Sequence, residues 1–98
     1  MIAWTDPANF ELDGQRYRIC VDGAEMKTLR STDDCFVIVK SKPMVDRFWN
    51  EYHDRTDVRR IVELGVFQGG SSAFYAQVCQ PDTLVGVERT DAPAIALE

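Results

Sequence analysis

The residues with the clearest chemical potential lie at positions 63–72, in the stretch ELGVFQGGSS. Three glycines, Gly65, Gly69 and Gly70, follow the carboxylate of Glu63 and precede a segment of helical character. Glycine lets a backbone approach a ligand closely and adopt conformations closed to other residues. The first N–H groups of a helix have no partner inside the helix and favour negative charge. This spacing therefore predicts a cradle for a polar ligand.

A second carboxylate ends the next apolar run. Glu88 closes the stretch TLVGVE, 23 positions after Gly65. If residues 61–64 and 84–88 are neighbouring parallel strands, the two strand ends lie side by side. A carboxylate at that place can accept both hydroxyls of a ribose. The glycine loop and Glu88 together predict a ligand that carries a nucleoside.

The elements that must position these residues follow from the hydrophobic pattern. An apolar strand at 61–64, a helix at about 71–80 and a strand at 84–88 form a βαβ unit, whose strands are parallel. Before this unit, apolar side chains at helical spacing predict a helix over about 43–55, which Ser41 can cap.

The first forty residues have the character of β-structure. The pairs Asp13-Gly14 and Asp22-Gly23 each supply the positive φ angles of a two-residue hairpin turn. Residues 35–39 form an apolar run typical of a buried strand. We therefore expect a small antiparallel meander of three or four strands.

The composition argues against several classes of function. The chain has 98 residues, a net charge of −5 and no basic run, which opposes nucleic-acid binding. No apolar run approaches the roughly 20 residues that span a bilayer, and the N-terminus lacks the features of a signal peptide. Three cysteines without a CxxC motif fit a reducing compartment, so we expect a cytoplasmic location and no membrane. A single histidine and scattered carboxylates predict no metal site.

The stretch VELGVFQGGSS, followed by LVGVE, resembles motif I and the next acidic position of class I S-adenosylmethionine-dependent methyltransferases. That motif has an acidic residue, any residue, a glycine, three further residues and a glycine, often followed by Gly or Ser. Glu63, Gly65, Gly69 and Gly70 match it, and Glu88 matches the ribose-binding carboxylate. The resemblance covers roughly residues 41–90.

The resemblance implies an α/β chain with a truncated Rossmann-like methyltransferase fold. Residues 1–40 would be an N-terminal β-meander extension, and residues 41–98 the first, incomplete part of the cofactor-binding domain. The cofactor would be S-adenosyl-L-methionine and the partner a small-molecule methyl acceptor, most simply methylated on oxygen. The cofactor would be held by Glu63, Gly65, Val66, Phe67, Gly69, Gly70, Ser71, Glu88 and Arg89. The catalytic residues stay unknown, because in this family they follow the second strand, and the chain alone is expected to be an inactive N-terminal portion.

Two other functions stay open. One is a nucleotide-binding Rossmann fragment of an oxidoreductase, although Phe67 stands where the second glycine of G-x-G-x-x-G belongs. The other is a non-catalytic interaction or structural domain, in which the meander and the helix form a self-sufficient fold. For the glycine turn by itself the alternative is tight packing, and for Glu63 it is an ion pair with Arg59 or Arg60. Open edges of the two strands predict that the chain in isolation is poorly folded or pairs these edges with a second copy.

Overall fold

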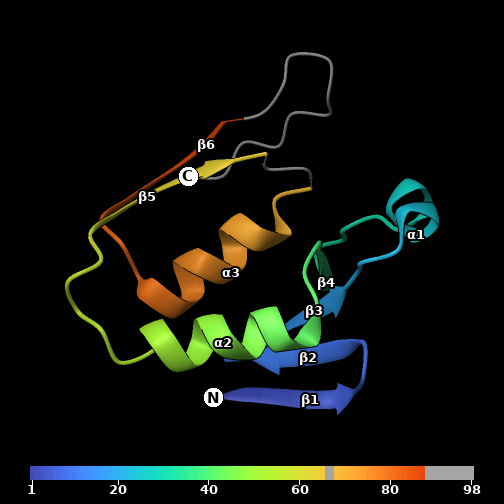
Figure 1. Ribbon diagram of the computed structural model, residues 1–98, viewed down its shortest axis with the longest axis horizontal. Coiled ribbons are helices and arrows are strands. Elements are labelled where there is room, and N and C mark those ends of the chain that lie inside the picture. The colour runs from blue at the N-terminus through green and yellow to red at the C-terminus, as the bar shows by residue number, and fades with distance from the viewer. Residues whose placement is uncertain (66–67, 88–98) are drawn as a thin grey trace.

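The computed structural model describes residues 1–65 and 68–87 and shows a mixed α/β chain with two separate sheets (Figure 1). Its elements are β1 (Ile2–Asp6), β2 (Asn9–Leu12), β3 (Gln15–Ile19), α1 (Gly23–Thr28), β4 (Cys35–Ile38), α2 (Lys42–Tyr52), β5 (Arg60–Leu64), α3 (Gly70–Cys79) and β6 (Thr83–Val87).

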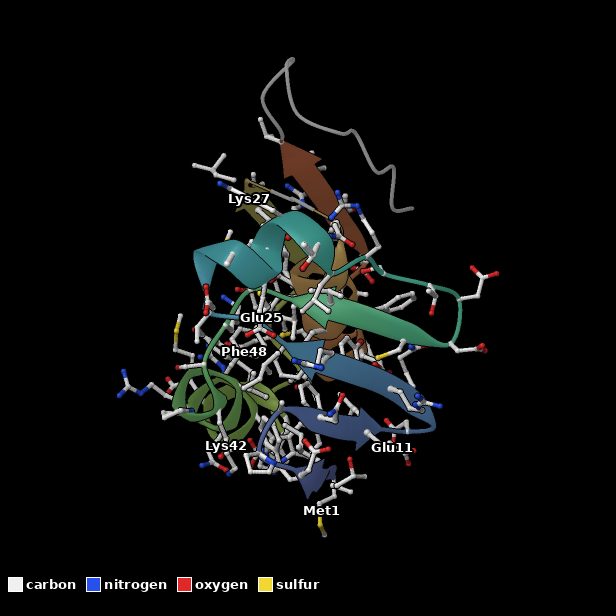
Figure 2. All side chains as sticks on the ribbon, turned by 90° about the vertical axis from the view of Figure 1, so that its right-hand side faces the viewer. Met1, Glu11, Glu25, Lys27, Lys42 and Phe48 are labelled. Carbon is white, nitrogen blue, oxygen red and sulfur yellow. The ribbon has the colours of Figure 1, made fainter. Side chains whose placement is uncertain are left out.

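The first sheet has the strand order β1-β2-β3-β4, and Figure 2 shows its four strands side by side. The pairs β1–β2 and β2–β3 are antiparallel. Asp13 and Gly14, at φ +49° and +85°, make the turn between β2 and β3, so the first hairpin prediction is confirmed. The fully antiparallel meander is wrong, because β4 pairs with β3 in parallel.

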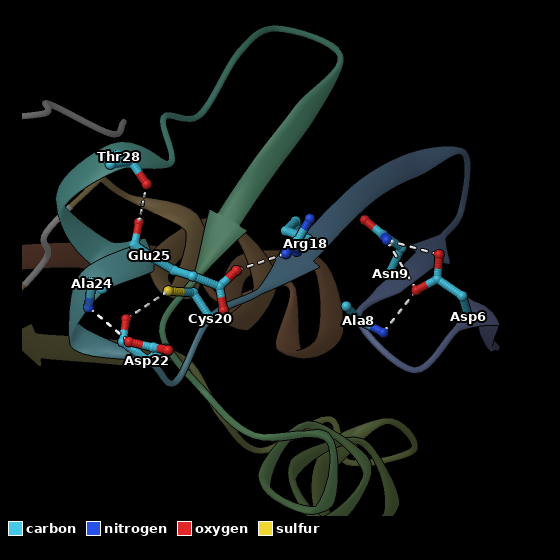
Figure 3. A network of polar contacts seen from close by, with 9 residues as sticks. All are labelled: Asp6, Ala8, Asn9, Arg18, Cys20, Asp22, Ala24, Glu25 and Thr28. Atoms are coloured by element: carbon cyan, nitrogen blue, oxygen red, sulfur yellow. Dashed lines mark hydrogen bonds and ion pairs between the residues drawn. The ribbon is translucent and has the colours of Figure 1, made fainter.

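The second predicted hairpin, at Asp22-Gly23, is also wrong. Asp22 has extended backbone, and its side chain accepts a hydrogen bond from the Ala24 N–H at 2.7 Å, so it caps α1 (Figure 3). Glu25, in the first turn of α1, accepts from Arg18 Nη2 at 2.7 Å and so holds the helix to β3. The chain therefore crosses over through α1 before β4, and a crossover is what parallel strands require.

The second sheet contains β5 and β6 in parallel, with Ile61 opposite Leu84 and Leu64 opposite Val87. Helix α3 lies between them in the sequence, so the predicted strand–helix–strand unit is confirmed over its described residues. The predicted helix over 43–55 is α2, which ends earlier, at Tyr52, and Ser41 caps it by accepting from the Met44 N–H.

Helix α3 lies between the two sheets and contacts β4, α2 and β6 (Figure 1). Phe74, at its centre, is fully buried and makes edge-on ring contacts with Phe10 and Tyr17 of the first sheet. The buried cluster is Phe10, Leu12, Tyr17, Ile38, Val45, Phe74, Val78 and Cys79. This core draws on both sides of the predicted division at residues 40 and 41, and that division stays a prediction.

One face of the second sheet is apolar and exposed. Val62 and Leu64 are 66% and 79% exposed, and Val85 and Val87 are each 47% exposed. Ile61, whose side chain alternates with theirs, packs against the core. Within residues 1–65 and 68–87, neither edge of this sheet has a further strand as neighbour. No helix in those same ranges has the length and apolar character needed to cross a membrane.

Candidate functional site

A cavity of about 480 Å³ lies where β5 ends and α3 begins. Among its lining residues are four of the predicted cofactor-binding residues: Glu63, Gly65, Gly70 and Ser71. Gly69 is adjacent, as the N-cap of α3. The structure thus brings together the part of the predicted site that it describes. Val66, Phe67, Glu88 and Arg89 lie outside the described residues.

Two glycines of the loop are needed for backbone conformation. Gly65 has φ +80° and Gly69 has φ +83°, in the left-handed region that side chains other than glycine rarely adopt. A β-carbon on Gly65 would meet no heavy atom within 4 Å, so this side of the backbone is open to the cavity. The strand end can therefore be approached closely by a ligand at Gly65.

Gly70 is needed for a different reason. A β-carbon there would lie 1.9 Å from the carbonyl oxygen of Val37, in β4. At this position the close neighbour is the protein's own backbone, as the tight-packing alternative predicts. The packing also brings the end of β4 to the cavity, where Val37 and Val39 form part of its wall.

Glu63 supplies a carboxylate to the cavity, held by the helix beside it. The hydroxyl of Ser72, which is only 1% exposed, donates a hydrogen bond to Glu63 Oε1. Arg59, one of the ion-pair partners considered for Glu63, lies 3.6 Å from Asp82. The contact with Ser72 fixes Glu63 near the start of α3, since Ser72 belongs to the first turn of that helix.

Opposite charges meet in this cavity. Lys40, which follows β4, lines it together with Glu63, and its Nζ lies 5.1 Å from the centre of the Tyr75 ring. Helix α3 has no acidic side chain in its first turn, and its N-cap is a glycine without a side-chain hydrogen bond. The start of α3 and Lys40 favour an anion, whereas Glu63 favours a cation. A zwitterion with an ammonium and a carboxylate group satisfies both.

Gln68 is a residue of the loop that sequence reasoning missed. Its Nε2 donates to the Leu29 carbonyl at 2.6 Å, and its Oε1 accepts from the Ser31 N–H. Ser31 in turn accepts from the Val37 N–H at 2.8 Å. The loop is therefore fastened to the segment that leads into β4. No local signal could have shown this, because Gln68 and Leu29 are 39 positions apart.

The polar side chains described in the lining of the site are Lys40, Glu63, Ser71 and Tyr75. Its described lining includes neither histidine nor cysteine. Cys20 and Cys79 lie away from the cavity. Burial raises the pKa values of their thiols, which keeps them protonated. Across residues 1–65 and 68–87, no three His, Cys, Asp or Glu side chains are close enough to hold a metal ion.

Comparison with protein-family models, curated proteins and solved structures finds no match to this chain. The strand end, the helix start and the charges between them are the features from which a function can be inferred.

Proposed function

We propose that this chain is the N-terminal, cofactor-binding portion of an S-adenosylmethionine-dependent methyltransferase that acts on the oxygen of a small molecule. One observation carries the proposal. The parallel unit β5–α3–β6 has a cavity where β5 ends and α3 begins, with Glu63 and Gly65 in its wall. In open α/β sheets, ligands bind beyond the carboxyl ends of the strands. Under this proposal the unit is the beginning of a Rossmann-like fold.

The described residues fit the amino-acid part of that cofactor. Its ammonium group can approach Glu63, and its carboxylate can approach Lys40 and the N-terminal turn of α3. The cavity volume of about 480 Å³ falls within the roughly 300–1,000 Å³ of small-molecule pockets. The ribose contacts expected of Glu88 and Arg89 stay predictions.

When bound, S-adenosylmethionine supplies an activated methyl group. The residues of this chain would contribute binding and orientation, so that an acceptor oxygen approaches the methyl carbon in line with the bond that breaks. Fixing two reactants in such a geometry replaces a bimolecular encounter and lowers the barrier substantially. We expect the 98-residue chain alone to be inactive.

Calorimetric titration of the chain with S-adenosylhomocysteine tests the proposal. We expect binding, and we expect Glu63→Gln to weaken it about tenfold or more, since a hydrogen bond to a charged group contributes about 1.5–3 kcal/mol. Glu11→Gln, an exposed change in β2, is the matched control and should leave the affinity unchanged. No binding, or equal affinity for the parent and Glu63→Gln, would overturn the proposal.

The same titration separates the alternatives. A dinucleotide places a pyrophosphate over the helix start, where the carboxylate of Glu63 would repel it. Tight binding of NAD without binding of S-adenosylhomocysteine would favour the oxidoreductase fragment. Binding of neither would favour a non-catalytic domain.

A further inference from the structure

A second cavity, of about 350 Å³, adjoins the first. We call it the aromatic groove; its walls include Lys40, Met44, Arg47, Phe48, Tyr52 and Tyr75. Lys40 and Tyr75 line both cavities, so these two side chains form a wall that the two spaces share. We propose that the aromatic groove binds the methyl acceptor and selects a planar aromatic carboxylate, an inference that rests on the proposed function.

The shape of the groove favours a flat ring. The Phe48 ring lies 4.6 Å from the Tyr75 ring and 4.7 Å from the Tyr52 ring, measured between ring centres. All three rings are partly exposed. Aromatic rings attract a further ring in tilted or offset arrangements beyond the effect of area alone. Met44, 51% exposed at the rim, adds a side chain that adapts to the shape of its neighbours.

The charges of the groove favour a carboxylate. Lys40 and Arg47 both line it, and within residues 1–65 and 68–87 neither cation has an ion-pair partner. Glu51 is the single acidic side chain among the described residues of the lining, so these residues together carry a net positive charge in an acidic protein. A guanidinium group binds a carboxylate through two parallel hydrogen bonds, which orients the acid as well as holding it.

The position of the groove gives it a role in transfer. A methyl group moves only to an acceptor that lies in contact with it, so the acceptor site must open into the cofactor site. Under this proposal the junction lies at Tyr75 and Lys40, which line both spaces. Helix α2 places Met44, Phe48 and Tyr52 on one face by their spacing of four residues, which explains how a single helix supplies most of the wall.

The test uses three probes of matched size: 4-hydroxybenzoate, its neutral amide 4-hydroxybenzamide, and the saturated acid 4-hydroxycyclohexanecarboxylate. By calorimetry, we expect 4-hydroxybenzoate to bind about tenfold more tightly than either counterpart. Arg47→Gln and Lys40→Gln should each remove most of that preference over the amide. Lys27→Gln, an exposed change in α1, is the control and should have no effect. Far-ultraviolet circular dichroism verifies that each variant is folded.

Three results would each overturn the proposal that the aromatic groove binds the methyl acceptor. They are equal binding of the three probes, no binding at millimolar concentration, and an Arg47→Gln variant that binds like the parent. S-adenosylhomocysteine binding distinguishes this failure from failure of the proposed function, because Arg47 lines only the groove. If S-adenosylhomocysteine binds and 4-hydroxybenzoate does not, the groove proposal fails and the methyltransferase stands. If only 4-hydroxybenzoate binds, with the predicted effect of Arg47→Gln, the groove is a carboxylate site and its role as acceptor site is overturned.

Discussion

The carbonyl oxygen of Val37 lies 1.9 Å from the place that a β-carbon at position 70 would occupy. This contact joins β4 to the start of α3, backbone against backbone. It explains why the loop carries a second consecutive glycine, since Gly69 already satisfies the turn. The wall of the candidate site therefore depends on the first sheet as well as on the strand–helix–strand unit.

The first prediction concerns this contact. Gly70→Ala should lower the free energy of unfolding by about 1–3 kcal/mol or more, because the added methyl group meets backbone that cannot turn aside. Urea denaturation measures the change. Gly23→Ala, at the start of α1, is the matched control: no atom lies within 4 Å of its β-carbon, so stability should stay unchanged or rise by up to about 1 kcal/mol. A Gly70→Ala variant as stable as the parent would contradict the packing.

The second prediction concerns Gln68, which fastens the loop to residues 29–31. Gln68→Ala removes two hydrogen bonds and should cost about 1–3 kcal/mol of stability. The more specific readout is amide hydrogen exchange, which should speed up at Ser31. Gln15→Ala, whose side chain bonds only to the adjacent Arg16 carbonyl, should leave that exchange rate unchanged. Unaltered protection of Ser31 in Gln68→Ala would show that the contact is not maintained in solution.

The third prediction concerns pH. Burial by itself would raise the pKa of Asp46, but hydrogen bonds from Lys42 and Trp4, each at 2.9 Å, outweigh it and hold the pKa below its ordinary value of 3.8. A carboxyl whose pKa is lowered by folding stabilises the protein above the unfolded value, and this contribution is lost as the pH falls through the folded value. Asp46→Asn should therefore be less stable than the parent at pH 7.

The two proteins should converge in stability only as the pH falls below the unfolded value of 3.8 and through the lower folded value. Denaturant unfolding at pH 7, 5, 4 and 3 follows this gap, with Asp34→Asn, a change of an exposed carboxyl in the turn before β4, as the matched control. A difference between Asp46→Asn and the parent that is independent of pH would refute the assignment.

The fourth prediction concerns the exposed face of β5 and β6. Four apolar side chains in adjacent register lie beside strand edges that lack a described partner, an arrangement that favours association of copies. We expect sedimentation velocity to show concentration-dependent association, and Val62→Lys to reduce it. Val21→Lys is a matched control, because Val21 is also 66% exposed but lies outside both sheets. A monodisperse parent over the accessible concentrations would contradict this expectation.

Sequence reasoning succeeded where structure depends on neighbouring residues. Asp13-Gly14 makes a hairpin by its own φ angles, and Ser41 caps α2 three residues ahead. It failed at Asp22-Gly23, where the same dipeptide caps a helix. The signal was present, since Asp22 and Glu25 have the spacing of an N-cap with an acidic third position, a helix-start pattern that competes with the turn.

The site was predictable only in part, for a similar reason. Glu63, Gly65 and Gly70 were found because a strand, a turn and a helix follow one another along the chain. Val37 belongs to β4 and Lys40 follows it, so both come from the first sheet and not from the strand–helix–strand unit. Tyr75 could be recognised as a site residue only once the groove between α3 and α2 was seen. Contacts between segments far apart in the chain produce no periodic pattern in the amino-acid sequence from which they could be predicted. The identity of the cofactor stays a prediction.

The location of α3 between two sheets has a consequence for how the protein is made. On a ribosome the chain emerges N-terminus first, at about 5–20 residues per second. Tyr17 precedes its hydrogen-bond partner Gln77 by 60 residues. At that rate of synthesis, α3 is made about 3–12 seconds after the aromatic residues of β2 and β3 that it covers. During that interval Phe10 and Tyr17 lack the edge-on ring contacts that Phe74 makes in the folded chain. The speed of synthesis between β3 and α3 thus sets how long the aromatic residues of β2 and β3 remain without their partners.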